Sequence, residues 1–406
     1  MRADGSRPAD GGSNALTRLL IALFGVTTVL TTAVVLLTGP RRPDTGLYFG
    51  QDFKIYYDAA REAVAGGDPY LPYDIGTSFL YHPFSLTTIS SVSWMGFDAA
   101  TWCWVVISML AWVATVALLR SALRELPQLA RHRRDIDVVC LAVLAMGPAL
   151  QSFFLGQVNT VVALATLGAF VASERRRPWL AGAALAFAIA LKTAPVVLLA
   201  YFLVTRRGRE LAATAVALVA FTGIAVLQFG GDIVTRWLST QRRVGDEPMT
   251  LYPNESFISV IPRGIARVTG GGEVPRKLAD LLLAADKLLI VAAVVALVVA
   301  GLRSRGSLAS RAPLFAAFVA ASVLFSPLVW YHHMVLLALP LALLLLDRRL
   351  LPAALGAVAL ALIQLQPVLY QVGIVLEVGM LAAHAAVLLG CALLVLRGTR
   401  RTEAVS

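Results

Sequence analysis

Residues 378–396 read VGMLAAHAAVLLGCALLVL and contain no aspartate, glutamate, lysine or arginine. About 20 such residues in a helix, at 1.5 Å each, cross the roughly 30 Å hydrocarbon core of a bilayer. Similar runs occupy 15–38 and 281–302. Backbone amides inside lipid have no water to bond, so these runs must be helices. The sequence therefore predicts an all-α protein that crosses a membrane several times.

The bulk composition excludes a soluble enzyme. The mean hydropathy is +0.75 and only 15% of the residues are charged, whereas soluble domains carry about a quarter. A net charge of +11 would suggest a nucleic-acid partner for a soluble protein, but here it indicates basic loops on the cytoplasmic face. The three cysteines, Cys103, Cys140 and Cys391, lie in apolar segments without metal-ligand spacing.

Basic clusters between the apolar runs set the orientation. They lie at 120–134, 175–177, 206–209, 303–311, 348–349 and 397–401. Because lysine and arginine concentrate in short cytoplasmic loops, we place these clusters and both chain ends inside. The runs then alternate as about twelve crossings, at 15–38, 99–120, 137–152, 158–173, 178–192, 195–205, 210–228, 281–302, 312–326, 334–346, 350–368 and 378–396.

This orientation divides the chain into a disordered cytoplasmic N-terminus at 1–14, one membrane domain at 15–396 and a cytoplasmic tail at 397–406. The first apolar run is too long for a signal peptide, so we expect it to be retained. Two long outer loops remain, at about 39–98 and 229–280. The apolar stretch 84–95 inside the first loop is too short to cross comfortably. We expect it to be re-entrant or packed at the interface.

The first outer loop predicts a short amphipathic helix on the membrane surface. Phe53, Tyr56, Ala60 and Val64 recur at helical spacing, with charged residues between them. Asp52 stands just before this helix. One interpretation is an N-cap, whose carboxylate accepts bonds from free amides. The other is a general base that takes a proton from an attacking hydroxyl, and the two roles can coexist.

Polar and aromatic residues near the same face are candidates for sugar binding. Tyr56, Tyr81 and His82 offer stacking surfaces, although aromatic residues are also ordinary at a membrane interface. Gln157 and Asn159 fall at the outer end of a helix pair. Their amides can bond sugar hydroxyls, or they can hold helices together. Both interpretations stay open for each group.

Cations on this side suit a phosphate group. Lys192 lies between two apolar runs near the helix-breaking Pro195, and burying its charge costs several kcal/mol unless the charge is paired. The alternative for Lys192 is a side chain that extends to the headgroups. Arg242 and Arg263 in the second outer loop offer paired donors for phosphate, or they are simply solvated. Asn254 in the same loop is a further candidate for sugar binding.

The segment 326–333, SPLVWYHH, completes the candidates. Tyr331 is a candidate for sugar binding, and His332 or His333 could hydrogen-bond a phosphate or carboxylate. Adjacent histidines point apart on a helix, so they are weak evidence for a metal. The chain carries no P-loop, GxSxG, HExxH or CxxC motif. We therefore expect no cofactor and no evident metal requirement.

Several short motifs in order resemble one family. They are Asp52-Phe53 followed by Tyr56, Gly-Asp-Pro-Tyr at 67–70, Tyr-His-Pro-Phe at 81–84, Gly-Gln-Val-Asn at 156–159, Pro-Trp-Leu-Ala-Gly at 178–182, Leu-Lys-Thr-Ala-Pro at 191–195, Asn-Glu-Ser at 254–256, and 326–333. Together they are similar to the polyprenol-phosphate-sugar-dependent glycosyltransferases of actinobacteria, which include α-mannosyltransferases and an arabinofuranosyltransferase. The chain departs from the family pattern at His82 and Tyr331.

The resemblance implies a C-type membrane glycosyltransferase fold with its site on the outer face of the plasma membrane. It implies a sugar donor on a polyprenyl monophosphate, with Asp52 as base in an inverting displacement and His332 or His333 near the reacting groups. The acceptor would be a cell-envelope glycolipid or polysaccharide, and nucleic acid would not be a partner. Mannose is favoured over arabinofuranose. A lipid or small-molecule transporter, or a C-type enzyme that uses an aminosugar or a protein acceptor, stays open.

Overall fold

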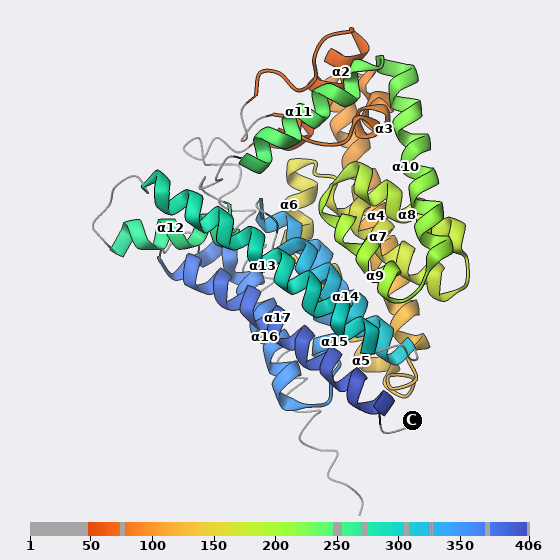
Figure 1. Ribbon diagram of the computed structural model, residues 1–406, viewed down its shortest axis with the longest axis vertical. Coiled ribbons are helices and arrows are strands. Elements are labelled where there is room, and N and C mark those ends of the chain that lie inside the picture. Colours follow the sequence, from red (N-terminus) through yellow and green to blue (C-terminus); the bar gives the residue numbers. More distant parts are fainter. Residues whose placement is uncertain are drawn as a thin grey trace, which may run out of the picture.

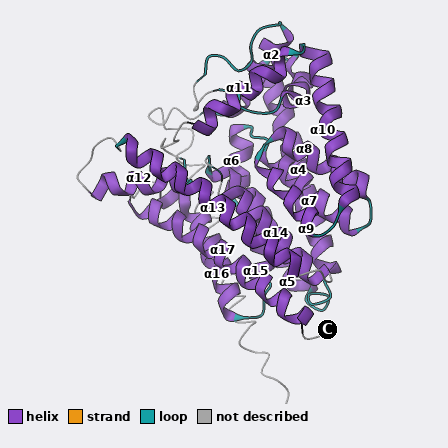
Figure 2. Cartoon of the chain, viewed as in Figure 1, coloured by secondary structure: helices purple, strands orange, loops and turns teal. Residues whose placement is uncertain are grey.

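The computed structural model describes residues 48–73, 78–246, 254–268, 275–303, 308–324, 326, 328–369 and 374–403. Within these ranges the chain forms helices and no strands (Figures 1 and 2). The all-α prediction is confirmed for this part of the chain. The N-terminal tail and the first expected crossing, 15–38, lie outside the described residues.

Each expected crossing after the first coincides with helix. The helices at these positions are α4 (Phe97–Glu125), α5 (Arg133–Leu144), α6 (Gly147–Leu155), α7 (Asn159–Glu174), α8 (Pro178–Leu191), η3 (Ala194–Val197), α9 (Leu198–Val204), α10 (Gly208–Phe229), α13 (Arg276–Arg303), α14 (Leu308–Leu324), η4 (Tyr331–Leu337), α15 (Ala338–Leu345), α16 (Leu350–Leu369) and α17 (Ile374–Glu403).

Four stretches in the described part are long and apolar enough to cross a membrane: Phe97–Glu125, Arg133–Leu155, Gly208–Phe229 and Arg276–Leu302. The other apolar helices are shorter. Some expected crossings consist of two short helices in succession, such as η3 followed by α9. The chain is thus a helical protein of membrane type, while the count of about twelve crossings stays a prediction.

Both outer loops contain helices. α3 (Pro83–Ser93) is eleven residues long, about 16 Å at 1.5 Å per residue, so it is too short to cross a bilayer. It packs against α2 (Gln51–Val64) and α10. The second loop forms α11 (Asp232–Asp246) and α12 (Phe257–Val268), which the sequence did not lead us to expect. In Figure 1, α2, α3 and α11 lie together at the top of the molecule.

The structure corrects the placement of α2. The helix is amphipathic as predicted, but its apolar face is covered by protein rather than lying on the membrane surface. Phe53 is fully buried and stacks on Trp104, with ring centroids 5.9 Å apart. Val64, expected on the same apolar face, is 63% exposed. α2 is therefore a packed element that can hold its side chains in fixed positions.

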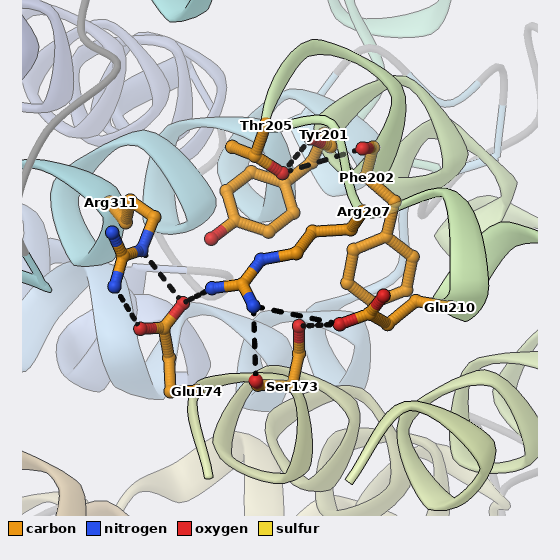
Figure 3. Close-up of polar contacts among 8 residues, drawn as sticks. All are labelled: Ser173, Glu174, Tyr201, Phe202, Thr205, Arg207, Glu210 and Arg311. Atoms are coloured by element: carbon orange, nitrogen blue, oxygen red, sulfur yellow. Dashed lines mark hydrogen bonds and ion pairs between the residues drawn. The ribbon is translucent and has the colours of Figure 1, made fainter. Parts of the chain in front are cut away.

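A group of charged residues joins three helices at the end of α7 (Figure 3). We call Ser173, Glu174, Arg207, Glu210 and Arg311 the charged cluster. The Glu174 carboxylate pairs with Arg207 at 2.9 Å and with Arg311 at 2.5 Å. Ser173 donates to Glu210 at 2.8 Å. α7, α10 and α14 are thereby tied together at the end where basic clusters predict the cytoplasm.

Candidate active site

Asp52 lies in the first turn of α2, and its carboxylate is directed at the turn between α6 and α7. The N-cap of α2 is Gly50, with φ 77°, and not Asp52. The Oδ2 atom of Asp52 instead accepts a hydrogen bond from Nε2 of Gln157 at 2.6 Å. The interpretation of Asp52 as a helix cap is therefore wrong.

The turn between α6 and α7 brings Gln157 to this carboxylate. Gly156 has φ 70°, and a Cβ added there would lie 2.6 Å from the Cβ of Phe53. Only glycine tolerates both the left-handed backbone and this close approach to α2. A side chain at position 156 would push the Gln157 amide away from Asp52.

Two tyrosines fix the amide of Gln157. The Tyr56 hydroxyl donates to Oε1 of Gln157 at 2.7 Å and lies 3.1 Å from the Tyr81 hydroxyl. Because Oε1 accepts from Tyr56, the NH₂ group of Gln157 must face Asp52. Four residues named from the sequence thus form one network, which aims the Asp52 carboxylate.

Lys192 supplies the opposite charge. Its side chain is only 8% exposed, and Nζ donates to Oδ1 of Asn159 at 2.6 Å. The ammonium is buried among protein groups rather than extended to the headgroups. It interacts electrostatically with Asp52. Burial raises the pKa of the Asp52 carboxyl, against the opposing effects of the Gln157 hydrogen bond and the Lys192 charge.

The two histidines have different surroundings. His333 accepts through Nδ1 from the backbone amide of Trp330 at 3.2 Å, so it closes the start of η4. His332 places Nδ1 3.2 Å from Oε1 of Gln151. Its Nε2 has no hydrogen-bond partner in the described part of the chain. Both rings interact electrostatically with Lys192, and His332 keeps the atom that could meet a substrate.

The segment 254–256 is hydrogen-bonded to residues 328–330, which precede η4. Oδ1 of Asn254 accepts from the amide of Val329 at 2.9 Å, and the amide of Glu255 donates to Val329 O at 2.6 Å. Arg263 donates to the Asn254 carbonyl at 2.8 Å and to Ser259. Asn254 and Arg263, expected to bind sugar and phosphate, thus take part in holding this segment in place.

His82 and Arg242 make no hydrogen bond to the Asp52 network in the described part of the chain. Nδ1 of His82 accepts from the Phe84 amide and caps α3, while its Nε2 lies 3.2 Å from the Thr222 hydroxyl. Burial lowers the pKa of His82 to about 4, so the ring is neutral. Arg242 is exposed on α11. The predictions that His82 binds sugar and that Arg242 binds phosphate stay predictions.

Two further groups beside the site, one buried and one half-buried, were not among the candidates named from the sequence. Glu255 is 3% exposed, although it stands in a loop. Gln151 of α6 reaches His332. An acid flanked by Asn254 and Ser256 looks like any polar loop residue, and only the bonds to Val329 show that this loop turns inward. Among the described residues, no group of three or more His, Cys, Asp or Glu side chains is placed to hold a metal.

These features define an enzyme-like polar site enclosed by membrane-type helices. A family model described as glycosyltransferase family 87 matches residues 79–327, and the chain belongs to this family. It is therefore a membrane glycosyltransferase, and its resemblance to the polyprenol-phosphate-sugar-dependent enzymes of actinobacteria is confirmed.

Two curated relatives carry the same name, polyprenol-phosphate-mannose-dependent alpha-(1-2)-phosphatidylinositol mannoside mannosyltransferase. The protein of Mycobacterium tuberculosis is 29% identical over 308 residues, which are 70% of this chain and 67% of the relative. The protein of Mycolicibacterium smegmatis is 28% identical over 300 residues, 69% of this chain and 63% of the relative. The matches thus span about two thirds of the length of each relative.

Proposed function

We propose that this protein transfers mannose from a polyprenyl-monophosphate donor to a cell-envelope glycolipid or polysaccharide on the extracytoplasmic face of the plasma membrane. The observation that carries the proposal is the Asp52 carboxylate, which is held by Gln157 and interacts electrostatically with the buried ammonium of Lys192. A fixed base near a buried cation is what an inverting displacement from a phosphate requires.

In the proposed reaction, an acceptor hydroxyl attacks the anomeric carbon of the donor sugar. The new carbon–oxygen bond forms as the bond to the phosphate oxygen breaks, and the phosphate leaves with the electron pair. Asp52 takes the proton of the attacking hydroxyl, and Lys192 stabilises the negative charge that develops on the phosphate. Gln157 is a positioning residue, because it acts through the carboxylate that it holds.

The burial of Asp52 supports this role. A carboxylate whose pKa is raised binds a proton more readily than an exposed one, which suits a general base. Lys192 is held by Asn159 at 2.6 Å, so its ammonium does not have to reorganise when charge appears on the leaving group. The lysine neutralises one phosphate without a metal, and we expect chelators to leave the rate unchanged.

Mannose is the favoured sugar, since both curated relatives are named as mannose-dependent. The acceptor in their names, a phosphatidylinositol mannoside, favours a glycolipid acceptor here. The alternative sugar is arabinofuranose. It would be carried by the same polyprenyl phosphate, so the phosphate contacts described above do not separate the two.

The test uses the purified full-length chain in lipid nanodiscs. Polyprenyl phosphate carrying radiolabelled mannose is supplied with a phosphatidylinositol mannoside, and the lipid product is separated by chromatography. A matched reaction uses the arabinofuranosyl donor. Formation of a longer glycolipid with mannose alone supports the proposal. A parallel assay places the protein in proteoliposomes. Entry of label into their lumen without any product would instead identify a transporter.

A further inference from the structure

We propose that Glu255, together with the Tyr331 hydroxyl and Nε2 of His332, forms a subsite that binds the hydroxyl groups of a sugar ring. The inference rests on the proposed glycosyltransfer and assigns a part of the substrate to residues outside the Asp52–Gln157 network. The shared ligand chemistry is a neutral hexose, which is either the sugar of the donor or the terminal sugar of the acceptor.

The first observation is the burial of Glu255. Only 3% of the residue is exposed, and neither carboxylate oxygen has a hydrogen-bond partner within the described ranges. A buried polar group without a partner destabilises the fold by about 1–3 kcal/mol, and more when it is charged. Native proteins keep few such groups, and those that remain need a functional or structural reason.

The second observation is that Glu255 does not stand alone. The Tyr331 hydroxyl and Nε2 of His332 are also buried without a hydrogen-bond partner among the described residues. The amide nitrogen of Asn159 and the hydroxyl of Ser256 share this property. A ligand with several hydrogen-bonding groups can satisfy such a set of atoms.

Hydrogen bonds and electrostatic interactions link the segments that carry these atoms. Glu255 bonds through its amide to Val329, two residues before Tyr331, and its carboxyl interacts electrostatically with Tyr331. His332 follows Tyr331 in η4 and interacts with Lys192. Lys192 in turn bonds to Asn159. These contacts link the second outer loop, η4 and the cation that interacts with Asp52.

A sugar fits this set of atoms better than a phosphate. An ionised Glu255 would repel a phosphate anion, whereas sugar hydroxyls donate to a carboxylate and accept from N–H groups. Burial also raises the pKa of the Glu255 carboxyl well above its usual range, against the effect of Arg263. Sugar hydroxyls that donate to both oxygens would stabilise the ionised form, whereas the amide of a glutamine offers only one acceptor oxygen.

The test is the variant Glu255→Gln, assayed with donor and acceptor varied separately. A glutamine keeps the shape and loses the acidic oxygen pair. We expect KM to rise about 10- to 100-fold for the substrate whose sugar is bound, which is the usual effect of losing one strong hydrogen bond. A rise for the donor assigns the donor sugar to the subsite, and a rise for the acceptor assigns the acceptor sugar.

Monodeoxy sugars separate binding from a purely structural role. Wild-type protein should lose affinity for the analogue that lacks the hydroxyl bound by Glu255, while Glu255→Gln should show no further loss with that analogue. A structural defect would lower the affinity for all analogues by the same factor. The matched control is Glu210→Gln, another buried glutamate, which accepts from Ser173 in the charged cluster. It should leave both KM values unchanged.

Two outcomes overturn the inference and leave the proposed function standing. In one, Glu255→Gln transfers mannose with wild-type kcat and KM. In the other, it loses affinity equally for every deoxy analogue. If wild-type protein itself transfers no sugar, the proposed function fails first, so the two failures are distinguishable.

Discussion

The substitution Asp52→Asn tests the proposed base most directly. Asparagine keeps the shape of the side chain and one oxygen, so the 2.6 Å bond from Gln157 can persist. The bond changes from charge-assisted to neutral, which costs about 1 kcal/mol. That loss is small against the whole stability of a folded protein, about 5–15 kcal/mol. We expect the variant to fold and to extract as a single species.

The expected kinetic effect is much larger than the effect on stability. A positioned general base contributes about 10²- to 10⁴-fold to rate, equal to roughly 3–5 kcal/mol of activation free energy. Turnover of Asp52→Asn should fall by at least the lower factor, while KM for the donor changes little. The measurement is initial velocity in nanodiscs with radiolabelled donor, together with direct binding of the donor lipid.

The pH dependence gives an independent check. Asp52 acts as a base only when ionised, so the rate should fall as pH drops through its pKa. Burial raises that pKa above 3.8, and the acid limb of kcat/KM should lie above that value. The effect of pH on the free energy of unfolding has the opposite sign to its effect on the rate. Because the folded state favours the protonated acid, Asp52 contributes stability at low pH that is lost as pH rises through its raised pKa.

The matched control is Asp58→Asn. Asp58 lies on the exposed face of the same helix and pairs with Lys54 at 2.6 Å, so it should keep wild-type turnover. Near-normal turnover of Asp52→Asn, with a large loss for Asp58→Asn, would refute the assignment of the base.

Three further outcomes follow from the described contacts. Lys192→Met should raise KM for the donor about 10- to 100-fold by removing the ammonium that Asn159 holds, and equal donor binding in both proteins would exclude the phosphate role. A cysteine at Ala65, exposed after α2, should react with an impermeant maleimide in intact cells, whereas one at Gln128 should react only after permeabilisation; the reverse pattern would invert the topology. Glu174→Gln should lower the thermal midpoint by breaking two ion pairs, at a cost of about 1–3 kcal/mol, and an unchanged midpoint would show that the cluster is not stabilising.

Much of the candidate site could be predicted because its residues break a strong local pattern. A lysine at 192 and an amide pair at 157 and 159 interrupt apolar helices, where burial demands a partner or a function. The structure brings Lys192 to Asn159 and Gln157 to Asp52. The helices themselves follow from hydropathy, which depends only on neighbours in the chain.

Other features depend on contacts between distant segments. Asn254 looked like a sugar-binding amide, but its side chain bonds to Val329, and nothing near it in the sequence indicates that partner. The same bond turns Glu255 inward and explains why its burial was missed. His82 was named as a candidate for sugar binding, and its neighbours in the sequence did not indicate that its Nδ1 also caps α3. We expected the apolar face of α2 to lie against lipid. The spacing of apolar residues in the sequence is the same whether that face meets lipid or packs on an aromatic side chain such as Trp104.

The charged cluster has a consequence for how a long lipid can enter. α7 carries Asn159 at its first residue and Glu174 at its last, so a rigid rod of about 22 Å connects the two ends. At the Glu174 end, ion pairs join α7 to Arg207 and Arg311. At the Asn159 end, one hydrogen bond joins α7 to the ammonium of Lys192. We expect the end held by the single hydrogen bond to move more than the end held by ion pairs when a long lipid enters between the helices. Distances between paired spin labels should accordingly spread more at the Asn159 end than at the Glu174 end when donor lipid is added.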